Sequence, residues 1–122
     1  MKANMYGLPL NTDLDFLVGK ELMQVCLGRY QSVLHFEGQL TITLECGFQV
    51  RLRGGHRHQE RSKRSQTNRL SRLLGNKIVQ VTNNGGGELT LAFSNGSVLV
   101  VSDTNSEYES YQIADPTHTI VV

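Results

Sequence analysis

The chain has 122 residues, of which 39% are hydrophobic and 19% are charged, and this size and composition predict one globular domain with a core of its own. No apolar run reaches the about 18 residues of a membrane-spanning helix, and residues 1–11 lack a basic stretch followed by a long apolar one, so neither a membrane span nor a secretory signal is expected. The net charge of +1 is unevenly distributed: residues 51–72 hold eight basic residues and one acidic residue, whereas the rest of the chain holds four basic and ten acidic residues.

The first half of the chain is predicted to contain an N-terminal arm followed by four strands. Residues 1–16 form the arm, because Pro9 excludes a helix there. The apolar run at 22–27 is typical of a strand that is covered on both faces. Three further strands are predicted by the alternation of apolar and polar residues, near 32–37, 40–45 and 48–52. Together these four strands make up a first β unit at 17–53.

The middle of the chain, residues 54–74, is expected to form a basic loop and a short helix. Residues 54–68 contain almost no apolar side chain, so they have nothing to contribute to a core. The helix follows them, with Leu70, Leu73 and Leu74 as its apolar face, and a glycine directly after these leucines is well placed to end it.

The second half, residues 75–122, is predicted to be another β unit. Its strands are expected near 78–82, 89–93, 98–101, 108–113 and 120–122. Asn95-Gly96 separates two apolar runs and predicts a hairpin whose two central residues both have a positive φ.

Two stretches of the chain repeat each other. Residues 17–25 and 73–81 keep leucine, glycine, glutamine and valine in step, and both are followed by an apolar-x-Phe pattern and a glycine turn. Such a duplication indicates one supersecondary unit used twice around a shared core. We therefore expect a single domain at 1–122 that is mainly β, in which two pseudo-repeated antiparallel β-meander units form a sandwich or a rolled sheet.

The cysteines and histidines do not predict a catalytic, metal or cofactor site. Cys26 and Cys46 lie in apolar, strand-like runs and are expected to be buried, reduced thiols, with a disulfide between them as the alternative. Burial would silence Cys26 as a nucleophile. His56 and His58 have basic neighbours that disfavour a bound cation. The glycines at 85–87 precede a strand rather than a helix, so they indicate a hairpin loop and not a phosphate-binding loop.

The basic segment is the leading candidate for a binding surface. Its cations raise the local concentration of anions and suit contacts with phosphates or with an acidic protein surface. Because the segment has no aromatic residue to stack on bases, another protein or a second copy of this chain is expected as the partner ahead of nucleic acid. Solubility of a long loop is the remaining interpretation. The candidate residues are Arg51, Arg53, Arg57, Arg61, Lys63, Arg64, Arg69 and Arg72.

An acidic and aromatic strand near the end of the chain is the second candidate surface. Glu107, Glu109 and Tyr111 share one face of this strand, and Tyr108 lies on the other. The strand is interpreted either as a solvated sheet edge or as a contact surface for a basic partner.

The motifs Leu8-Pro9-Leu10, Phe93-Ser94-Asn95-Gly96 and Glu107-Tyr108-Glu109-Ser110-Tyr111, together with residues 13–22, resemble a widespread bacterial family of small β-rich proteins known only as a domain of unknown function. The resemblance covers most of the chain except the basic loop. It implies a fold, and it brings no established activity and no catalytic residues. Small β proteins of this kind are similar in size to toxin-neutralising immunity proteins, which is a likeness at the level of the fold.

The sequence therefore favours a non-enzymatic binding module of the bacterial cytoplasm that contacts another protein, as an immunity-type or accessory factor. The alternative is binding of nucleic acid or another anion through the segment from Arg51 to Arg72. An enzyme would require His35, His118 and the acidic residues Glu107 or Glu109 to converge in one pocket, which nothing in the sequence indicates.

Overall fold

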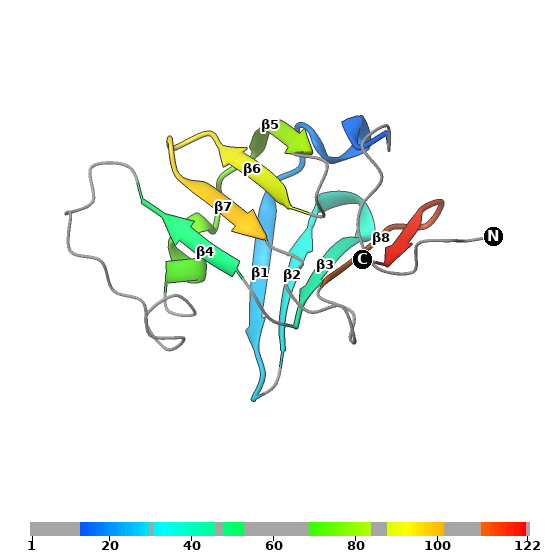
Figure 1. Cartoon of the computed structure of the whole chain (residues 1–122), viewed down its shortest axis with the longest axis horizontal. Coiled ribbons are helices and arrows are strands. Elements are labelled where there is room, and N and C mark those ends of the chain that lie inside the picture. Colours follow the sequence, from blue (N-terminus) through cyan, green and yellow to red (C-terminus); the bar gives the residue numbers. More distant parts are fainter. Residues whose placement is uncertain are drawn as a thin grey trace.

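The computed structural model describes residues 13–29, 31–45, 48–52, 69–83, 88–101 and 111–121, and these residues form two antiparallel β-sheets (Figure 1). The prediction of a mainly β protein is confirmed. The strands are β1 Leu22–Leu27, β2 Ser32–Phe36, β3 Leu40–Leu44, β4 Phe48–Arg51, β5 Ile78–Asn83, β6 Leu89–Phe93, β7 Val98–Val101, β8 Tyr111–Ala114 and β9 Thr119–Val121. Three short 3-10 turns accompany them: η1 Asp15–Leu17, η2 Glu37–Gln39 and η3 Ser71–Leu73.

In the strand order, each sheet combines strands from both halves of the chain. The first sheet has the order β1-β2-β3-β8-β9, and the second has the order β4-β7-β6-β5. Thus β4 leaves the first half and pairs with β7, whereas β8 leaves the second half and pairs with β3. The expected meanders account for β1–β3 and β5–β7, and the sequence alone did not predict that the fourth strand of each half crosses over.

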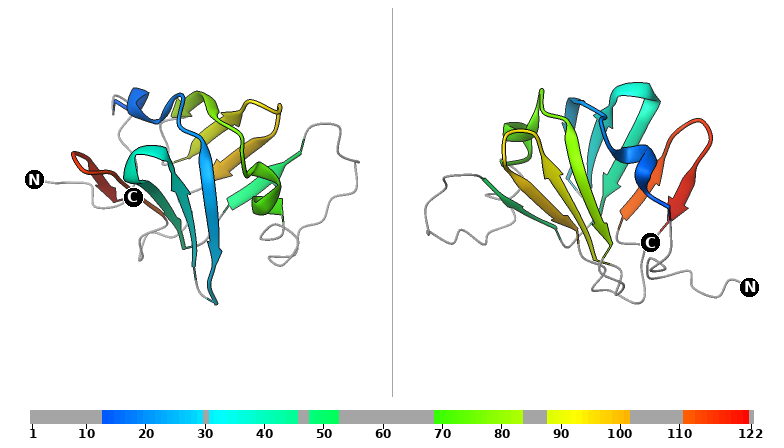
Figure 2. Two further views of the ribbon diagram at one scale, coloured as in Figure 1. Left: turned by 180° about the vertical axis from the view of Figure 1, so that it is seen from behind. Right: turned by 90° about the horizontal axis from the view of Figure 1, so that it is seen from above.

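The hydrophobic core lies between the two sheets, which face each other in Figure 2. The central strands β2, β3 and β6 bury every second residue, as the alternation in the sequence predicts. Phe36 of the first sheet and Phe93 of the second stack across the core, with ring centroids 6.4 Å apart. This contact joins the two sheets at the C-terminal ends of β2 and β6.

Two short turns close the core where each half begins. Leu14 and Leu17, at η1, are buried, and so are Leu70 and Leu73 at η3. Arg69 and Leu70 are helical, which agrees with the predicted short helix, but the turn then tightens to 3-10 and the chain becomes extended at Leu74. Leu74 is therefore exposed and does not belong to the apolar face expected of it.

The first residues of β1 and β5 are held side by side by backbone hydrogen bonds. The amide of Gly19 donates to the Ile78 carbonyl, and the amide of Gly75 donates to the Leu22 carbonyl, at 2.7 and 2.9 Å. Both glycines have a positive φ, +91° and +82°, a conformation that other residues adopt only with strain. Glu21 and Lys77 form an isolated antiparallel bridge between these segments. We call this junction the seam.

The prediction that the run at 22–27 is covered on both faces is wrong. Strand β1 lies at the edge of its sheet, and a β-bulge between Leu22 and Gln24 interrupts its alternation. The core therefore receives Leu22 and, partly, Val25, whereas Met23 is exposed. Strand β5 lies at the edge of the other sheet and has its own bulge, between Ile78 and Gln80.

The expectation that Cys26 is buried is also wrong. The free thiol of Cys26 is exposed rather than buried, because the bulge leaves Cys26 on the outer face of the edge strand, opposite Val33. Because Cys26 is free, it does not form the alternative disulfide; Cys46 itself lies outside the described residues.

The hairpin predicted at Asn95-Gly96 is confirmed by the pairing of β6 with β7, but its turn differs from the expected one. Only Gly96 has a positive φ, +88°; Asn95 does not. The Asn95 side-chain oxygen accepts a hydrogen bond from the Ser97 amide, and the Phe93 amide donates to the Ser97 carbonyl. These bonds fit a three-residue loop that ends on a left-handed glycine.

Candidate functional site

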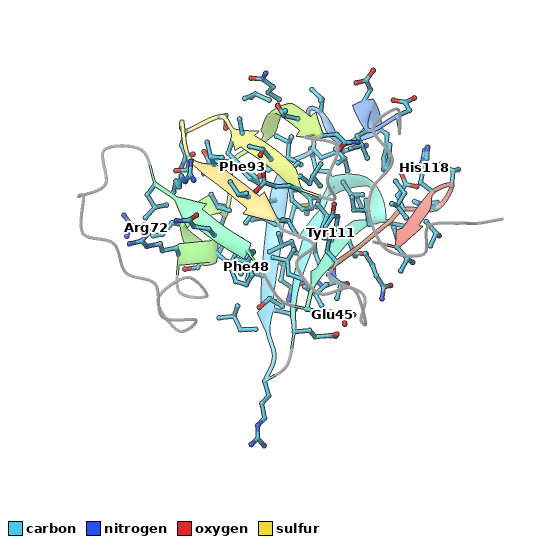
Figure 3. The ribbon with its side chains drawn as sticks, viewed as in Figure 1. Glu45, Phe48, Arg72, Phe93, Tyr111 and His118 are labelled. Carbon is cyan, nitrogen blue, oxygen red and sulfur yellow. The ribbon has the colours of Figure 1, made fainter. Side chains whose placement is uncertain are left out.

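The part of the basic segment that the structure describes lies at one end of the molecule, where β4 meets the turn η3 (Figure 3). The Arg69 guanidinium donates a hydrogen bond from Nη1 to the Val50 carbonyl, at 3.1 Å. This bond fixes the two ends of the segment beside each other. Arg51 is exposed at the end of β4, and Arg72 is exposed on η3. We call Arg51, Arg69 and Arg72 the basic face.

The structure does not describe the other predicted members of this surface. Arg53, Arg57, Arg61, Lys63 and Arg64 lie outside the described residues, as do His56 and His58. The one aromatic side chain near the described ends of the segment, Phe48, is partly buried and packs against the core, so it is not presented for stacking.

The prediction that Tyr111 belongs to the second candidate surface is wrong. This side chain is fully buried in the core, although it was expected to share a face with the carboxylates of Glu107 and Glu109. Tyr111 pairs with Leu44, and the alternation along β8 turns Tyr111 and Ile113 inward. The sequence contained a signal for this burial: Ile113, two residues after Tyr111, is apolar and lies on the same face of the strand. Glu107, Tyr108 and Glu109 lie outside the described residues.

The turn between β8 and β9 contains an interaction that the sequence reasoning missed. The Asp115 Oδ1 oxygen accepts hydrogen bonds from the backbone amides of Thr117 and His118, at 2.9 and 2.6 Å, and lies 2.9 Å from Nδ1 of His118. The His118 ring stacks on Phe16 of η1, with centroids 3.9 Å apart and the planes at 3°. An Asp-Pro-x-His turn was the available signal.

The electrostatics of this turn favour a charged carboxylate. Desolvation of Asp115 acts to raise its pKa, but the hydrogen bonds from His118 and Thr117, together with the charge of His118, outweigh it and hold the pKa below its ordinary value. The hydrogen bonds to Asp115 hold the turn together. The stacking of His118 on Phe16 attaches this turn, and with it the β8–β9 hairpin, to η1.

The Asp115 carboxylate is expected to stabilise the fold only at a pH where it is ionised. Because its pKa is lower in the folded protein, its contribution is complete above the unfolded value of about 3.9 and is lost as the pH falls through the folded pKa. Asp115→Asn should lower the midpoint of thermal unfolding at pH 7, and the difference from the parent protein should shrink towards pH 2. A difference that stays constant over this range would contradict this role.

Cys26 and His35 lie on the outer face of the first sheet. Cys26 pairs with Val33, and His35 follows two residues later on the same face. No hydrogen bond joins them among the interactions of the described residues, and His118 lies on the distant β8–β9 turn. The structure therefore does not assemble a thiol–imidazole pair.

Neither a metal centre nor a phosphate-binding loop is formed by the described ranges. They contain no group of three or more His, Cys, Asp and Glu residues that is suited to hold a metal ion. Asn83 ends β5 and pairs with Leu89 of β6, so the glycine-rich stretch connects two antiparallel strands, as predicted. Within the same ranges, no helix is long and apolar enough to cross a membrane.

Comparison with known proteins identifies a family. The model of DUF6188, a family of unknown function, matches residues 14–122. No curated protein and no solved structure matches the chain.

Proposed function

Because the chain belongs to DUF6188, a family of unknown function, its activity has to be inferred from its surface, and we propose that it is a non-enzymatic binding module whose basic face contacts an acidic surface of another protein. The hydrogen bond from Arg69 to the Val50 carbonyl is the observation that carries this proposal. It holds one cation beside β4, and two further arginines are exposed nearby in the chain, Arg51 at the end of β4 and Arg72 on η3. A fixed group of like charges steers an oppositely charged partner and sets its orientation.

We further propose that the module acts in a bacterial cytoplasm, as an immunity-type or accessory factor. The free and exposed thiol of Cys26 is compatible with a reducing compartment. The bacterial origin comes from the resemblance of the sequence alone.

Nucleic-acid binding through the same cations is the second candidate. Phosphates satisfy guanidinium groups as carboxylates do, and the basic segment supplies further positive charge. The absence of aromatic residues from 51–72, together with the packing of Phe48 against the core, favours a protein partner.

We also infer that the two halves of the chain derive from one duplicated unit. Several features at matching positions support this: η1 and η3 precede Gly19 and Gly75, the bulges follow Leu22 and Ile78, and each half sends its fourth strand to the other sheet. The backbone amides of Glu21 and Lys77 are both bonded by side chains, Glu37 Oε1 and Ser94 Oγ. The basic face has no counterpart in the first half, where Asp13 and Phe16 occupy the positions that match Arg69 and Arg72.

Arg72→Glu tests the proposed binding face, with Arg29→Glu as a matched control, because both arginines are exposed and Arg29 lies by the β1–β2 turn. A labelled polyglutamate peptide stands in for an acidic protein surface, and its affinity is measured by fluorescence anisotropy. Reversing one charge of the basic face should weaken binding about threefold to tenfold, and the control should weaken it less. Equal losses would show that only the net charge matters and would refute a localised face.

The same assay separates the two candidate partners. Single-stranded RNA and duplex DNA replace the peptide, at low and at physiological salt. The proposal expects weak nucleic-acid binding that disappears at physiological salt. Binding that is tighter than that of the peptide, with a steep dependence on salt, would favour the nucleic-acid function instead.

A further inference from the structure

The seam carries a group of exposed apolar side chains. Val18, Met23, Leu74 and Val79 are exposed by 45%, 63%, 42% and 54%. They belong to the two chain segments that the backbone hydrogen bonds between the starts of β1 and β5 hold together (Figure 1). Val18 precedes Gly19 as Leu74 precedes Gly75, and Met23 follows Leu22 as Val79 follows Ile78. The four side chains are thus two pairs at matching positions.

These side chains share the outer surface of the seam with one acid and one base. Leu22 and Ile78 are fully buried, so the residues on either side of each point outward: Glu21 and Met23 on one segment, Lys77 and Val79 on the other. Glu21 and Lys77 form the antiparallel backbone bridge between the two segments, so they lie directly opposite each other.

We propose that the seam surface, Val18, Glu21, Met23, Leu74, Lys77 and Val79, binds a second copy of the chain in a two-fold symmetric dimer. In this dimer, Glu21 of each copy faces Lys77 of the other. The inference is independent of the basic face, which lies on β4 and η3.

The arrangement of charge selects a second copy as the occupant. The seam has an approximate two-fold arrangement of its own, with an acid on one side and a base at the matching position on the other. When two such surfaces meet about an axis that lies in the surface and runs between Glu21 and Lys77, each carboxylate is placed over an ammonium group. The apolar side chains of both copies are covered at the same time. A symmetric interface of this kind is self-complementary without any further partner.

The bulges determine how the copies would meet. An exposed edge strand can pair with another strand through its backbone, but β1 and β5 each have a bulge next to the seam, which disrupts such pairing. The contact therefore consists of side chains packed on side chains. A small interface of this type is expected to be reversible, with a monomer–dimer equilibrium at micromolar concentrations.

The oligomeric state tests the proposal, measured by sedimentation equilibrium over a range of protein concentrations. The parent protein should show a reversible dimer. Met23→Glu and Val79→Glu should each raise the dimer dissociation constant about tenfold or more, because they place an unpaired charge in the apolar contact. Leu27→Glu makes the same kind of change at an apolar side chain that is 51% exposed at the far end of β1, and it should leave the dimer unchanged. A protein that stays monomeric throughout, or seam variants that behave as the control does, would overturn the proposal.

Mixing two charge variants tests the facing of Glu21 and Lys77. Glu21→Lys and Lys77→Glu each place like charges across the interface and should weaken the homodimer. Mixing them should restore dimerisation as a heterodimer, because every facing pair is then of opposite sign. A variant that merely folds poorly would not recover on mixing, so circular dichroism of each variant accompanies the measurement. Failure of the mixture to dimerise more strongly than its components, when both are folded, would contradict the proposed geometry.

The proposed dimer and the proposed binding function can be rejected independently of each other. Arg72→Glu should leave the dissociation constant of the dimer unchanged, and Val79→Glu should leave the intrinsic affinity of each basic face for polyglutamate unchanged. An effect of Arg72→Glu on dimerisation as large as that of Val79→Glu would move the interface to the basic face and reject the seam.

Discussion

Phe93→Ala is expected to lower the free energy of unfolding by about 3–5 kcal/mol, a large part of the about 5–15 kcal/mol that stabilises a domain of this size. The Phe93 side chain is almost fully buried in β6 and stacks on Phe36 of the opposite sheet. Its removal leaves a cavity where the two sheets meet, and neither sheet can close it alone because each is held by its own strand pairing. Denaturant unfolding of the variant measures the loss.

Phe36→Ala provides the matched partner for this measurement. Phe36 is equally inaccessible in β2, so its substitution should cost about the same 3–5 kcal/mol. The double variant should lose less than the sum of the single losses, by about 0.5–1.5 kcal/mol, because the ring contact is lost only once. Val121→Ala, at an exposed side chain, should stay within about 0.5 kcal/mol of the parent protein. Strict additivity of the two phenylalanine variants would show that the rings do not stabilise each other.

Tyr111→Ala is expected to be as destabilising, by about 3–5 kcal/mol. Tyr111 is fully buried and pairs with Leu44, where β8 of the second half joins β3 of the first. Loss of the ring therefore weakens the packing at the strand exchange itself. Thermal and denaturant unfolding measure the effect, and Tyr111→Phe, which keeps the ring, should lose only about 1 kcal/mol.

The Tyr111→Ala variant also distinguishes between two interpretations of Tyr111, as a residue of a contact surface or as a residue of the core. As a member of a contact surface, Tyr111 would be replaceable with little change in stability and a clear loss of binding. As a core residue, it would change stability and affect binding only through unfolding. A Tyr111→Ala protein with the stability of the parent would restore the contact-surface interpretation and contradict the burial of this side chain.

The candidate site could be predicted only in part. The charge pattern from Arg51 to Arg72 is a property of the sequence, and the structure describes Arg51, Arg69 and Arg72 of its members. The hydrogen bond from Arg69 to the Val50 carbonyl depends on residues that are distant in the chain, so no local pattern indicates it. The same holds for the stacking of His118 on Phe16.

The sequence by itself determined the elements whose environment is local. In β2, β3 and β6 the alternation of apolar and polar residues matches the burial, since a strand within a sheet packs one face on the core and leaves the other outside. The glycine after Leu74 and the Asn95-Gly96 turn were also recognisable, because a positive φ is a property of the single residue.

Only the tertiary structure decided which strands lie at an edge and which strands pair across the two halves. The apolar run of β1 is the same whether one neighbour or two flank it, and the bulge that exposes Met23 and Cys26 arises from its pairing with β2. Likewise, Tyr111 lies in the core where β8 pairs with β3 of the other half of the chain. Pairing depends on residues far apart in the chain, and alternation within one segment fixes only which side chains share a face, leaving open which face, if either, is covered.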